Sequence, residues 1–245
     1  MTRSLTLMFL MTPLALHAQR TSPAVSTHIL TFAPTGLPET FQTYYRTAGN
    51  IELFTASVGT LGPPSPYTGP QDFALYTSKD DAEPATKRKP ANPPAATVTL
   101  PEKSDLVLIV CNRADDDKVS LVAHDLDSKD LKTGDYRVFN FSKSTISMNM
   151  GDQTLSLEPG KDAVVRDSKW HDEILSLPIK MATVTDGKSR SVYSSFREHS
   201  PQDRTLMFLF DGNHPSRPIT FATFNAEAAA DQPASGKGSS KRRKP

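Results

Sequence analysis

The chain has 245 residues, of which 37% are hydrophobic, so it can bury a sizeable core as one large domain or two small ones. Its 28 basic and 27 acidic residues nearly cancel, so the net charge by itself points to no class of partner, and no specific binding to nucleic acid is predicted. With 20 prolines, 12 glycines and no long helix-forming runs, the composition excludes a helical bundle and favours short strands joined by rigid loops.

Residues 1–18 have the pattern of an export signal. Arg3 precedes an apolar run from Leu5 to Leu16, and Ala18 stands before the predicted cleavage point at Gln19. An uncleaved N-terminal helix is the alternative, although the run is short for a membrane span. No later segment is apolar enough to cross a membrane, so we expect a mature protein in the periplasm or outside the cell.

Short apolar and β-branched segments follow one another along the rest of the chain, separated by turn residues. The predicted strands are 28–32, 41–46, 51–55, 73–77, 97–100, 106–111, 119–124, 136–141, 146–150, 153–157, 162–165, 179–185, 191–196, 205–210 and 219–224. They predict an all-β fold, an antiparallel β-sandwich of immunoglobulin-like or jelly-roll-like type, over residues 19–225. A division into two lobes near residues 127–135 is the alternative, and no internal repeat at a fixed period is visible.

The clearest hairpin lies at residues 146–157. Ile146, Met148 and Met150 alternate with polar residues, and a two-residue turn at Gly151-Asp152 places Met148 opposite Leu155. Glu158-Pro159-Gly160-Lys161 then predicts a type II turn, because proline sets φ at its second position and glycine allows positive φ at its third.

A second hairpin is predicted around Asp186-Gly187. Ile179 and Met181 on its first strand are expected to share a face with Val192, Ser194 and Phe196 on its second. This pattern predicts that Phe196 is buried.

Two proline-rich segments, residues 59–70 and 80–96, are predicted to be loops because proline is excluded from sheet interiors. The first displays Tyr67, which could stack on a sugar or on a proline of a partner, or could fold back to close the end of the sandwich.

The irregular segment 166–177 is predicted to hold one helical turn around Trp170. Trp170 and His171, followed by Asp172 and Glu173, form the strongest polar cluster. Trp170 is predicted to be mostly buried as the hydrophobic anchor of this segment, and a role in binding is the alternative. The histidines and the acidic run 114–118 lack metal-ligand spacing, so no metal is expected.

No phosphate-binding loop, nucleophile elbow or cysteine pair is present, so no cofactor is predicted. Cys111 ends the apolar run "LVLIVC" and is expected to be a buried thiol. The last segment, residues 226–245, has almost nothing to bury and is expected to be disordered. Its basic cluster consists of Lys241, Arg242, Arg243 and Lys244, which could contact an anionic surface or simply aid solubility.

The stretches "YRVFNFSKSTISMNMGDQTLSLEPGKDAVV" and "SVYSSFREHSPQDRTLMFLF" resemble uncharacterised secreted all-β proteins of environmental bacteria. In those proteins a strand with the pattern R-F-x-N-x-S leads to a short hairpin, and this chain has R-V-F-N-F-S at residues 137–142. The L-x-P-G turn and the later Y-S-S and R-T-L are present in both. The resemblance extends over roughly residues 40–225. It implies an exported sandwich, and it supplies no activity or catalytic residue.

These patterns predict an exported, non-enzymatic β-sandwich that binds or scaffolds an envelope component, which could be a glycan, a protein or an anionic surface. The alternative is a glycan-active hydrolase that uses loop carboxylates such as Asp172 and Glu173.

Overall fold

The computed structural model describes residues 23–34, 37–84, 92–113, 118–126, 131–171, 173–185, 188–214 and 216–226. Nearly all regular structure in these residues is β-strand, and the sheets are mostly antiparallel, as the sequence predicts. The short 3₁₀ helix η1 (Ser168–His171) is the helical turn predicted around Trp170. The export signal at residues 1–18 lies outside the described residues, as does the acidic run at 114–117.

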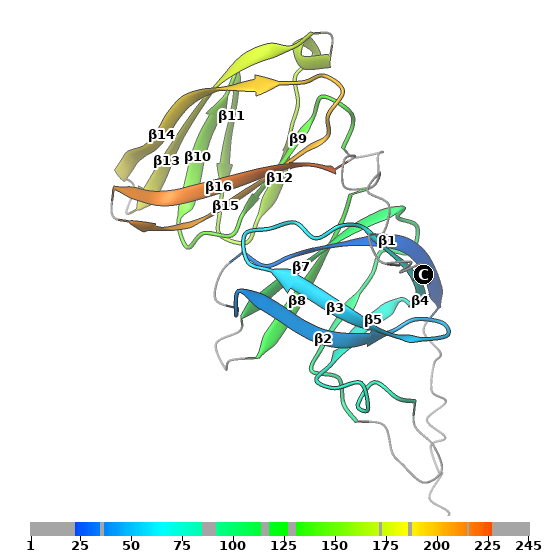
Figure 1. The fold of residues 1–245 in the computed structure, drawn as a ribbon. Helices are drawn as coiled ribbons and strands as arrows, with labels where there is room; N and C mark the ends of the chain where they lie inside the picture. The colour runs from blue at the N-terminus through cyan, green and yellow to red at the C-terminus, as the bar shows by residue number, and fades with distance from the viewer. Residues whose placement is uncertain are drawn as a thin grey trace, which may run out of the picture.

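The strands fall into two lobes, which we call the N lobe (residues 23–126) and the C lobe (residues 131–226) (Figure 1). The N-lobe strands are β1 (Ala24–Phe32), β2 (Thr40–Arg46), β3 (Ile51–Ser57), β4 (Ser65–Pro70), β5 (Asp72–Tyr76), β6 (Ala96–Thr99), β7 (Leu106–Arg113) and β8 (Val119–Asp125). The C-lobe strands are β9 (Tyr136–Asn140), β10 (Thr145–Met150), β11 (Gln153–Leu157), β12 (Asp162–Val165), β13 (Leu175–Thr185), β14 (Lys188–His199), β15 (Thr205–His214) and β16 (Arg217–Asn225).

The two lobes have the same topology. The N lobe contains the sheets β4-β1-β7-β8 and β3-β2-β5-β6, and the C lobe contains β12-β9-β15-β16 and β11-β10-β13-β14. Counted within each lobe, both have the strand orders fourth-first-seventh-eighth and third-second-fifth-sixth. The parallel pairs β1–β7 and β9–β15 also occupy equivalent places. The fold is therefore an internal duplication, which sequence inspection did not reveal because the equivalent strands differ in their residues.

Each lobe is a sandwich with its own core. In the N lobe, Ile109 and Cys111 from one sheet pack against Phe54 and Phe73 from the other. In the C lobe, Val138 and Met207 face Met148 and Ile179 across the two sheets. Burial raises the pKa of the Cys111 thiol to about 12, so the predicted buried thiol is confirmed and stays protonated at neutral pH.

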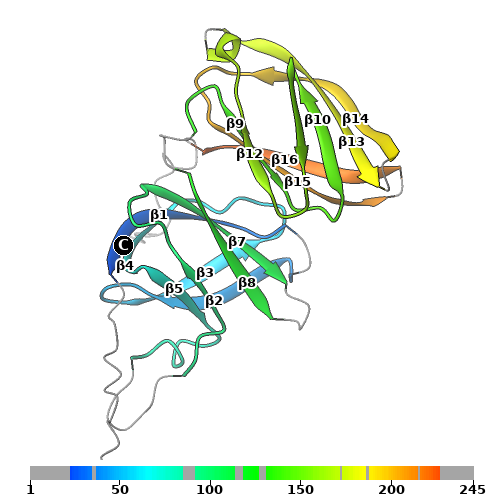
Figure 2. The ribbon, with the colours of Figure 1, turned by 180° about the vertical axis from the view of Figure 1, so that it is seen from behind.

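A third core joins the lobes. The sheets β4-β1-β7-β8 and β12-β9-β15-β16 face one another, so the four sheets of the molecule form successive layers (Figures 1 and 2). Phe32 on β1 lies 4.2 Å from Phe208 on β15, measured between ring centroids. Phe208 also contacts Phe139, Phe141 and Phe224. The contact between the lobes is therefore made by equivalent sheets.

The predicted hairpin at Gly151-Asp152 is confirmed in its register, since Met148 pairs with Leu155 and Gly151 has a φ of 56°. The turn before Lys161 is confirmed by a bond from its N–H to the carbonyl of Glu158. Strands β13 and β14 pair in the antiparallel sense predicted, although the turn residues 186–187 lie outside the described residues.

Two expectations need correction. Residues 65–70 were expected to form a loop, and instead they form β4, which pairs with β1 at the edge of its sheet. Proline is tolerated at such an edge because its missing N–H faces away from the ladder. The expected tail from residue 226 begins one residue too early, because Ala226 is buried between the lobes and its N–H donates to the carbonyl of Arg204.

A polar group closes one side of the contact between the lobes. Asp162 on β12 accepts a hydrogen bond of 2.7 Å from Nε of Arg137, and its other oxygen lies 3.5 Å from Nδ1 of His124 on β8. Burial alone would raise the pKa of Asp162, but the hydrogen bonds from His124 and Arg137 and the guanidinium charge outweigh it. The pKa therefore lies below its usual value.

A carboxylate with a lowered folded-state pKa stabilises the fold above its unfolded pKa of about 3.9, and this contribution is lost as pH falls through the folded pKa. We therefore expect Asp162→Asn to destabilise the protein at pH 6–7 and to approach the wild type as the pH falls below about 4. Urea unfolding between pH 3 and 7 measures this difference. A gap that stays constant over that range would show that the ionised carboxylate contributes nothing.

Candidate binding site

The structure places the two predicted aromatic site residues inside the protein. Tyr67 on β4 is 2% exposed, its ring packs against Tyr45 and Phe73, and its hydroxyl donates to the carbonyl of Pro70 at 2.7 Å. Burial raises the pKa of its phenol. Tyr67 has thus folded back into the sandwich, the second of the two alternatives drawn from the sequence, and its ring is not available for stacking on a ligand.

Trp170 is also 2% exposed, and it packs against Tyr136 and His199 in the C-lobe core. The Trp170 carbonyl, which can only accept, lies 2.7 Å from Nε2 of His199, so that nitrogen carries the proton. In the neutral ring, Nδ1 then accepts from the Tyr136 hydroxyl at 3.3 Å. The three residues form a satisfied buried network, which anchors η1 to the sandwich.

The remaining predicted site residues do not define a single site in the described part of the chain. The side chain of His171, the residue Asp172 and the basic cluster Lys241–Lys244 lie outside what the structure describes, and Glu173 is exposed. Among the described residues, no three histidine, cysteine or acidic side chains gather where they could hold a metal ion.

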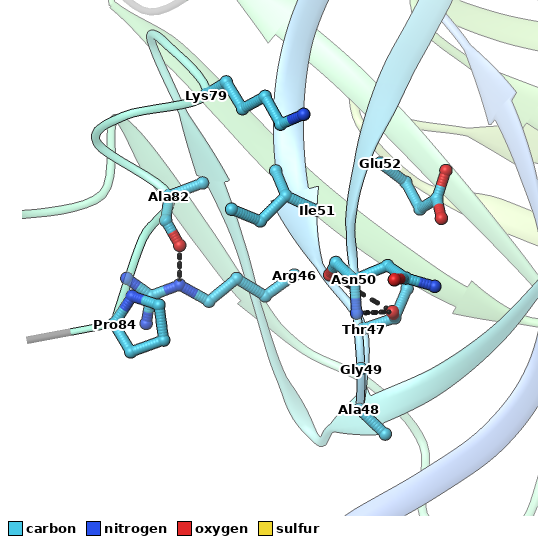
Figure 3. Close-up of a pocket in the computed structure, with 10 residues that line it drawn as sticks. All are labelled: Arg46, Thr47, Ala48, Gly49, Asn50, Ile51, Glu52, Lys79, Ala82 and Pro84. Carbon is cyan, nitrogen blue, oxygen red and sulfur yellow. Dashed lines mark hydrogen bonds between the residues drawn. The ribbon is translucent and has the colours of Figure 1, made fainter.

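A cavity of about 620 Å³ lies on the N lobe between the β2–β3 hairpin and the turn after β5 (Figure 3). Arg46 forms one side of it and donates through Nε to the carbonyl of Ala82 and through Nη2 to that of Glu83, at 2.7 Å. The Lys79 ammonium and the Glu52 carboxylate border the same hollow. Among the described residues that line this cavity, Glu52 is the one carboxylate, so they suit polar contacts more than acid–base catalysis by two carboxylates.

The C lobe presents a different surface, the outer face of the sheet β11-β10-β13-β14. This face is turned away from the N lobe (Figures 1 and 2). The inward side chains Met148, Met150, Ile179 and Met181 are buried, so the residues that alternate with them point outward. In register across the four strands, the outward row reads Thr154, Asn149, Lys180 and Ser194, all exposed. We call this row, together with Phe196 and Ser156, the outer polar face.

Phe196 belongs to the outer polar face and is 71% exposed, so the prediction of its burial was wrong. A β-bulge between Met181 and Ala182 of β13 shifts the register with β14. As a result Ser195 pairs with Ile179, and Phe196 points outward beside Pro178. A one-residue slip in register moves every following side chain to the opposite face of a sheet. The sequence showed that Ser194 and Phe196 share a face of the sheet. It did not show whether that face points into the core or toward solvent.

No family model and no curated protein matches the chain. Among the described residues, no helix is long and apolar enough to span a membrane. The fold and this surface together define a duplicated β-sandwich protein with one open, polar sheet face.

Proposed function

We propose that the protein is an exported binding protein of the cell envelope and that it is not an enzyme. Export is supported by the signal pattern of residues 1–18. Binding is supported by the outer polar face, where Phe196 stands exposed opposite Pro178 of β13, with Ser194 and Glu198 at the neighbouring outward positions of β14. An exposed aromatic ring can stack on the apolar face of a ligand, which the polar side chains around it cannot do.

The open sheet is the observation that carries this proposal. The outer row presents Asn149, Lys180 and Ser194 to solvent on three neighbouring strands, and Phe196 adds an exposed aromatic ring beside them. The alternative of a glycan hydrolase requires two carboxyl groups about 5–10 Å apart across a cleft. Glu173 is exposed on a short connection before β13, and the row Thr154, Asn149, Lys180 and Ser194 of the outer polar face contains no carboxylate.

The test has two arms. The full chain, expressed in a bacterium with an export pathway, should appear outside the cytoplasm with Gln19 as its first residue, as N-terminal sequencing would detect. The purified protein should also sediment with envelope fragments from bacteria. Retention in the cytoplasm with residues 1–18 intact would overturn export, and failure to sediment with any envelope fraction would overturn binding.

The basic tail is tested in the same assay. A variant that ends at Ala226 keeps the residue that packs between the lobes and removes Lys241, Arg242, Arg243 and Lys244. If the tail supplies the contact, this variant loses salt-sensitive sedimentation, since each basic residue near an anionic membrane contributes up to about 1 kcal/mol. If the sheet supplies it, sedimentation is retained.

A further inference from the structure

The internal duplication allows the outer faces of the two lobes to be compared directly. In the N lobe the equivalent sheet is β3-β2-β5-β6, and part of its outer face is covered by the chain itself. The turn after β5 brings Ala82, fully buried, against Arg46, whose guanidinium lies 4.6 Å from the centre of the Tyr76 ring. Tyr76 is 7% exposed as a result.

None of the C-lobe residues that the structure describes forms such a cover. Strand β13 ends at Thr185 and β14 begins at Lys188, so the connection between them is too short to fold back over the sheet. Thr154, Asn149, Lys180 and Ser194 remain exposed across the full width of the four strands. Since neighbouring strands are about 4.8 Å apart, the row spans about 14 Å.

The chemistry of this row suits a chain of sugars. Each strand contributes a hydroxyl, amide or ammonium group, at a spacing close to the length of one sugar unit, and hydroxyls of a glycan both donate and accept hydrogen bonds. Phe196 lies two positions along β14 from Ser194, so its ring borders the row at one side. Such a ring packs on the apolar C–H face of a pyranose, while the row contacts its hydroxyls.

The charge of the row selects among glycans. No described residue pairs with the ammonium of Lys180, which stands exposed between Asn149 and Ser194 in the register of the sheet. An unpaired ammonium among neutral hydroxyls and amides is complementary to a carboxylate. We propose that the outer polar face binds an extended polysaccharide whose units carry carboxylates, with Phe196 stacked on one sugar and Lys180 paired with a carboxylate.

Two other partner classes fit less well. Protein interfaces are depleted of lysine in their centres, whereas the outer polar face carries Lys180 on the central strand β13. Nucleic acids are held by several cations along the phosphate backbone, and the row supplies a single one. A polysaccharide requires neither an apolar centre nor a cluster of cations.

This inference rests on the proposed binding function and is tested separately from it. The mature chain, residues 19–245, is run in native gels that contain polygalacturonate, a neutral glucan or no polymer. We expect retardation by polygalacturonate. Phe196→Ala should raise the dissociation constant about tenfold, the fold-change that corresponds to one stacked ring. Lys180→Gln should abolish the preference for polygalacturonate over the glucan.

The matched control is Leu53→Ala. Leu53 is a 51% exposed apolar residue on β3, in the equivalent sheet of the N lobe, and its removal should leave retardation unchanged. Thermal melts of all variants show whether they remain folded. If the wild type migrates alike in all gels, or if Leu53→Ala and Phe196→Ala weaken binding equally, the polysaccharide inference is overturned.

Envelope sedimentation separates this failure from a failure of the proposed function. Periodate cleaves the vicinal diols of sugars, so envelope fragments treated with it should no longer sediment the protein. Sedimentation that survives both periodate and Phe196→Ala would leave an envelope-binding protein whose ligand is not a polysaccharide on this face.

Discussion

Phe208→Ala is expected to lower the free energy of unfolding by about 3–5 kcal/mol, the range for large aromatic side chains deleted from a core. Phe208 is fully buried between the lobes, where it contacts Phe32 of the N lobe and Phe139 of the C lobe. Alanine leaves a cavity in a contact made from two rigid sheets, which cannot move together to fill it. Chemical unfolding followed by intrinsic fluorescence and by circular dichroism measures the loss.

The matched control is the same substitution at Phe196, which is 71% exposed and should change stability by less than about 0.5 kcal/mol. The number of unfolding transitions shows whether the cavity weakens the contact between the lobes or the core of one lobe. Because Phe208 joins the lobes, its loss should separate their unfolding into two transitions, while a single transition would be retained if the damage lay within one core. A loss below about 1 kcal/mol would show that the lobes do not depend on this contact.

Asn140→Ala is expected to cost about 3 kcal/mol, because it leaves several buried groups without a partner at once. Asn140 is fully buried at the end of β9, and its amide donates to the carbonyls of Ser144 and Leu157, each at 2.9 Å. Its carbonyl oxygen accepts from the N–H and the hydroxyl of Ser142. One side chain thus joins β9, the start of β10 and the end of β11.

Asn149→Ala serves as the control for this substitution. Asn149 is exposed in the outer polar face, so its loss should lie within about 0.5 kcal/mol of the wild type in urea unfolding. Equal effects at the two positions would contradict the buried network. The burial of Asn140 has a second consequence. Asn140 is the acceptor of the N-glycosylation sequon Asn140-Phe141-Ser142, and its buried amide cannot accept a glycan once the protein has folded.

The candidate site was less accessible to sequence reasoning than the fold. Tyr67 and Trp170 were candidate binding residues, but both are buried. The burial of Trp170 was predicted, and that of Tyr67 was one of the two alternatives, because large aromatic rings near the end of a sandwich pack into its core. Phe196 was assigned to the core, yet it is exposed. The face on which Phe196 lies depends on a β-bulge in the β13–β14 pair. No residue type in β13 or β14 predicts that bulge.

Local order was determined by the sequence itself. The alternation of Met148 and Met150, the turn at Gly151-Asp152 and the pairing of Met148 with Leu155 follow from a period of two and from the φ that glycine allows. The run "LVLIVC" likewise predicted a strand buried on both faces, and β7 is such a strand.

What covers each face was decided only by the tertiary structure. Ile109 on β7 packs inside its own sandwich, whereas Leu108 faces the other lobe, and both residues look alike in the sequence. The duplication, the contact of Phe32 with Phe208 and the exposure of Phe196 were all invisible for the same reason. Alternation shows which side chains share a face of a sheet, but the burial of that face depends on a second sheet that comes from a distant part of the chain.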